Sequence, residues 1–192
     1  MNYLATRNWL LKNSAANRLF PVRRIVLVFL LASSLSATAF AGTPGEVEVG
    51  EYLREAKLQG LFGKTKKLSD YQGKPLLINV WASWCRPCRA EMGSLERLAR
   101  RYNGKQFNVI GISTDDDGKA AAMFIRRSKV TFENFLDSNL LLENMLGANT
   151  IPLTILVDAQ GRVLEKARGA YQWDSPEMVN AIGATFKINL KR

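Results

Sequence analysis

The 192-residue chain contains no histidine and only two cysteines. A zinc site would need about two ligands beyond the cysteines, and none of the usual nitrogen or sulfur ligands is left to supply them. Copper sites built on imidazole, and cysteine nucleophiles activated by a histidine base, are excluded for the same reason. If a side chain handles protons in this protein, we therefore expect it to be a carboxylate.

The N-terminal region lacks acidic residues and carries an apolar run that is short for a membrane span. The first 24 residues include five basic ones, and the run Ile25–Ala41 follows, ending on Ala39-Phe40-Ala41. Serines and a threonine dilute these 17 residues, whereas a spanning helix needs roughly 20 apolar ones. We interpret residues 1–41 as a signal peptide cleaved after Ala41, with a retained membrane anchor as the alternative. Both predict a periplasmic or otherwise extracytoplasmic protein.

The length suits one globular domain after this leader, with residues 42–53 as a linker and the domain over 54–192. The formal net charge of +10 falls to +5 once the five leader charges are removed, so the domain is only mildly basic. No pattern points to nucleic acid. The domain has one basic cluster, Arg86, Arg89, Arg97, Arg100 and Arg101. The cluster is either a solvated helix face or a surface that attracts acidic partners or an anionic membrane.

Short apolar runs alternate with helical patterns along the domain, which indicates an α/β architecture. The almost continuously apolar run Pro75–Trp81 is typical of a strand buried on both faces. A hairpin is expected from Glu55–Leu58 and Lys66–Leu68. Further strands are expected at Phe107–Ser113, Thr131–Leu136, Leu153–Val157 and Arg162–Ala167. Helices are expected at Pro87–Tyr102, Lys119–Lys129 after an Asp115–Asp117 cap, Asn139–Leu146, and from Pro176 after a Ser175 cap.

The two cysteines form the motif Cys85-Arg86-Pro87-Cys88, between a predicted buried strand and a predicted helix start. Free backbone N–H groups and the helix dipole favour a thiolate there, so we expect a lowered pKa for Cys85. Arg86 adds positive charge beside it. Cys88 lies one turn into the helix on its apolar face, where it would resolve a mixed disulfide rather than attack. A purely structural disulfide is the alternative, although such bridges usually close longer loops.

The segment Trp81–Met92 resembles the active-site segment of TlpA/ResA-type (DsbE-like) extracytoplasmic thioredoxins, and the likeness covers roughly residues 55–186. Asn79 fits this branch, because cytoplasmic thioredoxins carry a buried Asp there. The resemblance implies a thioredoxin fold: a central mixed β-sheet flanked by helices, with an N-terminal β-hairpin and a central insertion. It also implies a reductase for apocytochrome c or copper-site assembly proteins, recharged by a membrane electron carrier of DsbD/CcdA type. No cofactor is expected.

The resemblance assigns roles to further residues. Glu91 matches a glutamate that exchanges a proton with the resolving thiol; a carboxylate stabilising the first helical turn is the alternative. Pro152 matches a cis-proline opposite the cysteines, and the backbone of Ile151 would pair with an incoming peptide. An ordinary trans proline at a strand start is the alternative there. Trp84 is expected at the rim of the site.

The favoured function is therefore an extracytoplasmic disulfide reductase, and three alternatives stay open. The first is a disulfide oxidase or isomerase of secreted proteins, because the redox potential cannot be read from Arg86 and Pro87. The second is a peroxidase, although the proline and threonine neighbourhood of a peroxidatic cysteine is missing around Cys85. The third is a non-enzymatic carrier that holds Cu(I) between the two thiolates.

Overall fold

The computed structural model describes residues 44–190, so the leader expected over residues 1–41 lies outside the described residues. Within 44–190, none of the helices has both the length and the apolar character needed to cross a membrane.

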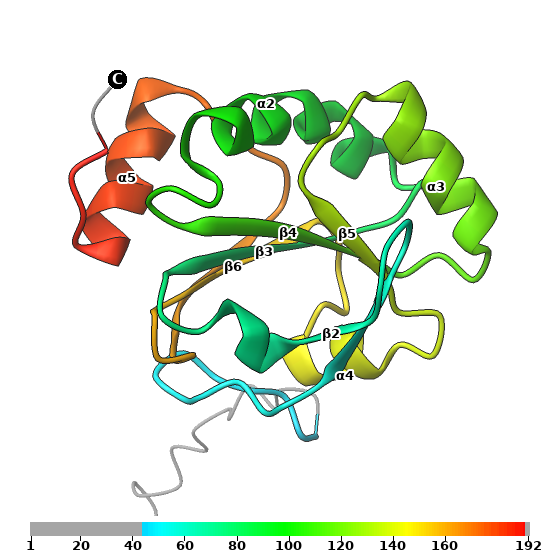
Figure 1. The fold of residues 1–192 in the computed structure, drawn as a ribbon, viewed down its shortest axis with the longest axis horizontal. Helices are drawn as coiled ribbons and strands as arrows, with labels where there is room; N and C mark the ends of the chain where they lie inside the picture. The colour runs from blue at the N-terminus through cyan, green and yellow to red at the C-terminus, as the bar shows by residue number, and fades with distance from the viewer. Residues whose placement is uncertain (1–43, 191–192) are drawn as a thin grey trace, which may run out of the picture. The chain divides into compact units, whose positions relative to one another are not determined.

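In this part of the chain seven strands form one mixed sheet, in the order β2-β1-β5-β4-β3-β6-β7 (Figure 1). The strands β3, β4 and β5 run parallel to one another, and the other neighbouring pairs are antiparallel. The predicted mixed sheet is thus confirmed. The bounds are β1 Lys57–Gly60, β2 Lys66–Lys67, β3 Leu76–Trp81, β4 Asn108–Ser113, β5 Glu133–Leu136, β6 Leu153–Val157 and β7 Val163–Arg168.

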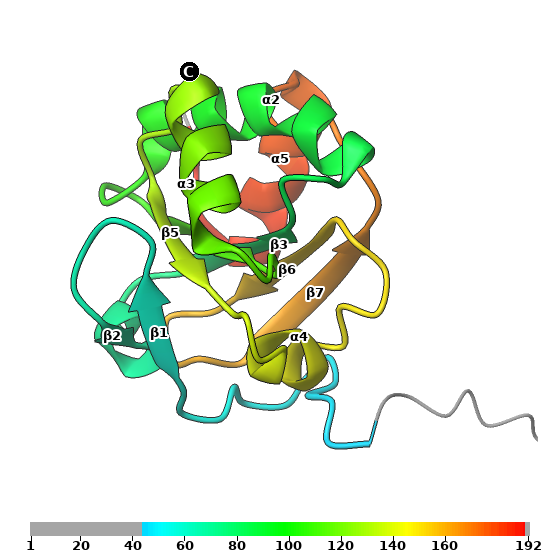
Figure 2. The same cartoon turned by 90° about the vertical axis from the view of Figure 1, so that its right-hand side faces the viewer.

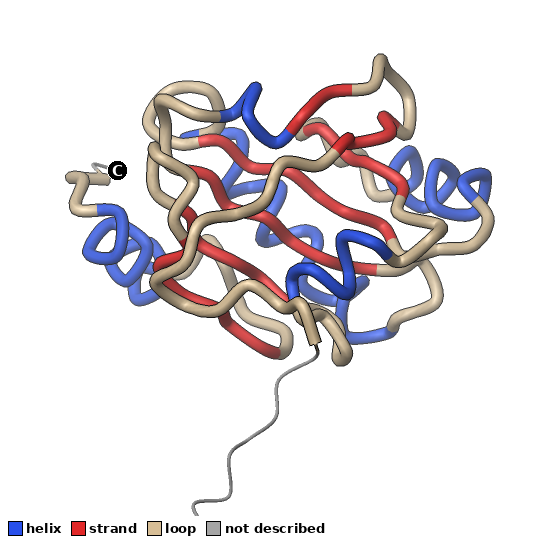
Figure 3. The backbone as a smooth tube through the Cα atoms, turned by 90° about the horizontal axis from the view of Figure 1, so that it is seen from below, coloured by secondary structure: helices blue, strands red, loops and turns tan. Residues whose placement is uncertain are grey.

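The helices lie on both faces of the sheet, with α2, α3 and α5 on one face and α4 on the other (Figure 1). In Figure 3, which shows the sheet from below, α4 lies across the strands on this second face. The bounds are α2 Arg86–Tyr102, α3 Gly118–Arg127, α4 Leu141–Leu146 and α5 Pro176–Phe186, with a 3-10 helix, η2, at Leu68–Tyr71. As predicted, Ser175 caps α5, where its side chain accepts a hydrogen bond from the N–H of Met178.

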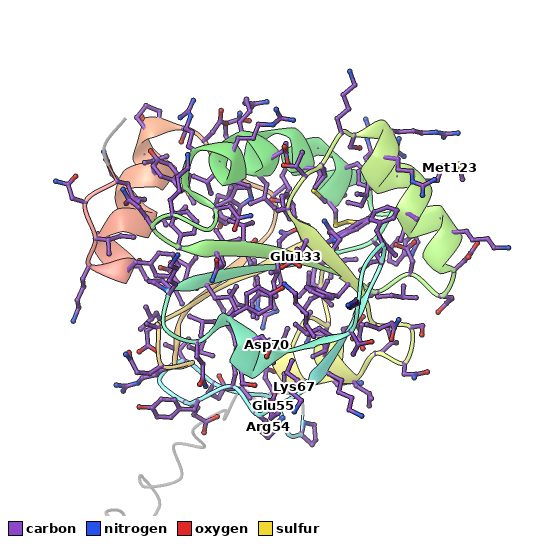
Figure 4. All side chains as sticks on the ribbon, viewed as in Figure 1. Arg54, Glu55, Lys67, Asp70, Met123 and Glu133 are labelled. Atoms are coloured by element: carbon purple, nitrogen blue, oxygen red, sulfur yellow. A yellow bond between two sulfur atoms is a disulfide. The ribbon has the colours of Figure 1, made fainter. Side chains whose placement is uncertain are left out.

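One detail of the predicted hairpin is wrong. Leu68 does not extend β2 but begins η2, because the carboxylate of Asp70 accepts the N–H of Lys67 and turns the chain (Figure 4). The cap expected from the three consecutive aspartates is present. Only Asp117 caps α3, accepting from the N–H of Lys119 at 2.8 Å.

The core has one layer on each face of the sheet. All six residues of β3 are buried, and they alternate between the layers. Leu77 and Trp81 pack under α2, α3 and α5, whereas Ile78 and Val80 pack on the side of α4. Burial on both faces explains the continuous apolar run in this strand.

The central insertion is the segment that contains β5 and α4. It follows α3 in the chain, and β5 lies between β4 and β1 in the sheet. The N-terminal hairpin therefore joins the core through β5. A hydrogen bond of 2.6 Å from the Tyr71 hydroxyl to Glu133, and an ion pair of 2.6 Å from Lys66 to Glu133, strengthen this junction.

Residues 46–53, expected as part of a linker, pack against the domain (Figure 2). Val47 is fully buried and its N–H donates to the carbonyl of Met145 at 2.8 Å. Glu46 forms an ion pair of 2.6 Å with Lys166, and both side chains are almost entirely shielded from solvent. Pairing the two charges is what makes their burial tolerable.

Gly147 permits this ion pair, which leads to a prediction. Its φ is +71°, and a Cβ at this position would overlap the Glu46 carboxylate. Gly104 has a similar φ of +74° with open space around it. We expect Gly147→Ala to lower the free energy of unfolding by at least about 2 kcal/mol more than Gly104→Ala, because only the former displaces a buried charge from its partner. Urea unfolding of both variants measures this, and equal losses would contradict it.

Candidate active site

The two cysteines lie at the junction of β3 and α2. They form a disulfide, with Sγ atoms 2.00 Å apart and Cα atoms 5.3 Å apart. Cys85 is the N-cap residue of α2, and its Sγ accepts a hydrogen bond from the N–H of Cys88 at 3.2 Å. A sulfur atom thus occupies the acceptor position that a serine or aspartate oxygen fills in most helices. The positive end of the helix dipole is directed at this atom, which favours a thiolate.

The two sulfurs differ in their access to solvent. Cys88 is completely buried, whereas Cys85 retains 5% exposure and follows Trp84, which is 69% exposed. An incoming disulfide therefore meets Cys85 and not Cys88. Trp84 is thus exposed next to Cys85 in the chain, and its place at the rim of the site stays a prediction.

The loop before β6 faces Cys85. Because β6 runs antiparallel to β3, the residues before β6 lie at the end of the sheet where β3 ends. The Sγ of Cys85 is 3.8 Å from the carbonyl oxygen of Ile151, and the peptide bond between Ile151 and Pro152 is cis. Pro152 is buried and Ile151 is partly exposed. As a proline, Pro152 brings no N–H group to this side of the sulfur.

Glu91 is buried, with 2% exposure, on the face of α2 that also carries Cys88. Its Oε1 accepts from Asn79 Nδ2 at 2.8 Å, and its Oε2 accepts from Trp173 Nε1 at 2.8 Å and from the N–H of Tyr171 at 3.1 Å. The alternative of a first-turn carboxylate is wrong, because no acidic residue lies in the first turn of α2.

Burial raises the pKa of the Glu91 carboxyl above its ordinary value of 4.5. The hydrogen bonds from Trp173, Asn79 and Tyr171 act in the opposite direction, because they stabilise the anion. The net effect is a carboxyl group that gains a proton more readily than an exposed glutamate. Glu91 lies one helical turn from Cys88. A carboxyl group there can accept a proton from the Cys88 thiol and return it.

Trp173 and Tyr171 contact Glu91, and the sequence reasoning did not predict either contact. They lie in the loop before α5, 80 or more residues from Glu91 along the chain, and their rings pack at a centroid distance of 5.4 Å. Nothing in the local sequence marks them. Asn79 also donates to Thr154 Oγ1 at 3.0 Å, and among the described side chains its Oδ1 is a buried oxygen atom without a hydrogen-bond partner.

A second buried carboxylate, Asp115, holds the loop that leads to the cysteines. It accepts the N–H of Ser83 at 2.8 Å, the hydroxyl of Ser83 at 2.6 Å and the hydroxyl of Ser113 at 2.7 Å. The side chain is only 3% exposed. The sequence suggested a helix cap here, whereas Asp115 connects the end of β4 to the segment before Cys85.

The family model that matches the chain is Redoxin, over residues 48–182. The chain belongs to the redoxin family. Among curated relatives of this redoxin, thiol-disulfide oxidoreductase ResA of Geobacillus thermodenitrificans is 30% identical over 145 residues, covering 74% of this chain and 83% of the relative. ResA of Bacillus cereus is 25% identical over 149 residues, covering 76% and 86%.

Solved structures agree with this assignment. A Chlorobium tepidum protein described as a thiol:disulfide interchange protein DsbE superimposes with a TM-score of 0.67 and 26% identity, covering 73% of this chain and 99% of that one. The predicted thioredoxin fold and the resemblance to ResA- and DsbE-like proteins are thus confirmed. Together with the Cys85–Cys88 disulfide, they make this redoxin a thiol-disulfide oxidoreductase.

The buried state of Glu91 predicts a pH-dependent stability in the oxidised protein, whose cysteines do not titrate. The folded-state pKa lies above the unfolded one, so between these two values the folded protein holds a proton that the unfolded chain has lost. The free energy of unfolding of the wild type should therefore fall, relative to Glu91→Gln, by up to about 1.4 kcal/mol per pH unit above pH 4.5. Urea unfolding from pH 4 to 8, at roughly half-unit steps, measures the difference; parallel curves would contradict it.

The contacts of Asp115 predict a large local effect on stability. Asp115→Ala leaves one buried donor, from Ser113, and two part-buried donors, from Ser83, without their acceptor, and we expect it to lower the free energy of unfolding by about 2–4 kcal/mol. The neighbouring Asp116 is exposed and provides the control. Asp116→Ala should change stability by less than about 0.5 kcal/mol. Similar losses in the two variants would show that Asp115 does not hold the loop.

Proposed function

We propose that this protein is a disulfide reductase that works outside the cytoplasm. The observation that carries the proposal is the position of Cys85 Sγ as the N-cap acceptor of α2, with Cys88 sealed behind it. This arrangement stabilises the thiolate of Cys85, which can meet a substrate. Cys88 is left to attack Cys85 in the second, intramolecular exchange.

The reaction proceeds in two exchanges. The Cys85 thiolate attacks one sulfur of a substrate disulfide, so the Cys85–substrate bond forms, the substrate S–S bond breaks and the second substrate sulfur leaves as a thiolate. The Cys88 thiolate then attacks Cys85 Sγ and releases the first substrate sulfur. Two electrons pass to the substrate, and the Cys85–Cys88 disulfide seen in the structure is the product.

Glu91 is the group we assign to the proton of Cys88. The thiol must be deprotonated before the second exchange, and Cys88 is buried away from water. A carboxylate on the same helix face, with a pKa raised by burial, is suited to take that proton and return it when the protein is reduced again.

The substrate segment is expected to lie over the Ile151–Pro152 loop. The carbonyl oxygen of Ile151 is beside Cys85, so an extended peptide that hydrogen-bonds to the Ile151 backbone would bring its cysteine to the reactive sulfur. Trp84, exposed beside Cys85, provides an apolar contact for the same segment.

The cellular role follows from the leader and the resemblance. A basic N-terminus followed by the Ile25–Ala41 apolar run supports export to the periplasm or its equivalent. The resemblance of the Trp81–Met92 segment to TlpA/ResA-type thioredoxins implies substrates such as apocytochrome c or copper-site assembly proteins, with electrons supplied by a membrane carrier of DsbD/CcdA type. The membrane is contacted only through the leader, if it is retained.

A disulfide oxidase or isomerase is the second candidate, because the same two exchanges run in reverse. The measured reduction potential decides between them. The reduction potential of a reductase should lie near about −270 mV, the value of thioredoxin, and that of an oxidase near about −120 mV. Cu(I) retained by the reduced protein without any reductase activity would instead favour a copper carrier.

The unequal roles of the cysteines can be tested by trapping. Cys88→Ser should accumulate a mixed disulfide between Cys85 and its substrate, because the resolving sulfur is missing, and its turnover should fall below about 1% of the wild type. Cys85→Ser should trap almost nothing. Mass spectrometry of adducts formed in the periplasmic fraction measures both, and equal trapping by the two variants would contradict the assignment.

A further inference from the structure

The structure divides the basic cluster of α2 into two groups. Arg97 forms an ion pair with Asp174 at 2.7 Å, and Arg100 forms one with Glu96 at 2.6 Å. Arg86 and Arg89 lie at the other end of the helix, beside the cysteines. Both are exposed, and within residues 44–190 neither has an ion-pair partner.

The positions of these two arginines oppose the helix dipole. Positive side chains are unfavourable in the first turn of a helix and favourable in the last, and α2 carries no acidic residue in its first turn. Arg86 and Arg89 are three residues apart, so their side chains leave the helix as neighbours. Two like charges placed side by side against the dipole, without a counter-ion, do not stabilise the fold. Such a local conflict is typical of a functional surface.

The acidic groups of this region do not neutralise the two arginines. Glu91 and Asp115 are buried and occupied by hydrogen-bond donors. Of the exposed pair Asp116 and Asp117, the latter caps α3. The surface beside Cys85 therefore offers two free guanidinium groups and the exposed Trp84.

We propose that Arg86 and Arg89 form a recognition surface for substrate proteins with carboxylate side chains beside the target disulfide. Arginine pairs with carboxylates in a two-pronged geometry, and unpaired charges at the edge of an interface speed association with an oppositely charged partner. This surface deepens the proposed reductase function and rests on it. Arg86 is adjacent to Cys85 in the chain, so Arg89 is the cleaner residue for a test.

The test compares two disulfide peptides that differ only in the residues flanking the cysteines, which are glutamates in one and lysines in the other. At low ionic strength the wild type should reduce the acidic peptide with a kcat/KM at least about tenfold higher, and the preference should shrink in about 0.5 M salt. Arg89→Glu should bring the ratio near one or invert it. Arg101→Glu makes the same change of net charge at the far end of α2 and should alter the ratio less than about twofold.

Two further measurements separate the explanations. The rate of each variant with the small uncharged substrate 2-hydroxyethyl disulfide measures the effect of its charge change on Cys85 itself, and the peptide rates are compared after division by this rate. The melting temperature of Arg89→Glu should rise, whereas that of Arg101→Glu should fall. A wild type that reduces both peptides equally overturns the recognition surface and leaves the reductase intact. A wild type that reduces neither peptide nor the uncharged disulfide overturns the reductase, and the recognition surface with it.

Discussion

The hydrogen bond from the N–H of Cys88 to the sulfur of Cys85 is the interaction on which the site depends. It requires that α2 begin immediately after Cys85, at the end of the sheet where the central strand β3 ends. β3 is buried on both faces, so its end cannot shift without disturbing both layers of the core. The rigid core thus fixes a reactive atom at a helix start, where the backbone itself stabilises negative charge.

Two buried carboxylates complete the site, and they have different tasks. Asp115 is surrounded by donors from Ser83 and Ser113, which hold the approach to Cys85 in one conformation. Glu91 is held by three donors, one from β3 and two from the loop before α5, and burial still raises its pKa. A carboxyl group that is fixed in position and has a raised pKa is suited to proton transfer in a chain without histidine. In the proposed mechanism this carboxylate handles the proton, and its buried environment raises its proton affinity.

The arginines at the two ends of α2 differ in whether they stabilise the helix. At its C-terminal half arginines are paired with acidic partners or complement the dipole, as a stable helix requires. At its N-terminal end the arginines are unpaired and oppose the dipole, beside the reactive sulfur. This arrangement is unfavourable for the helix, and it lies on the surface proposed to meet the substrate.

The sequence by itself determined the local features. The strand β3, the start of α2, the cap of α5 and the redox pair each depend on residues within one or two turns of chain, and local periodicity and capping chemistry reveal them. Only the tertiary structure decided which distant groups meet. Glu91 meets Trp173 and Tyr171, Ser83 meets Asp115, and Glu46 meets Lys166, across separations of 32 to 120 residues. Such contacts arise from the packing of whole elements, and no short-range pattern encodes them.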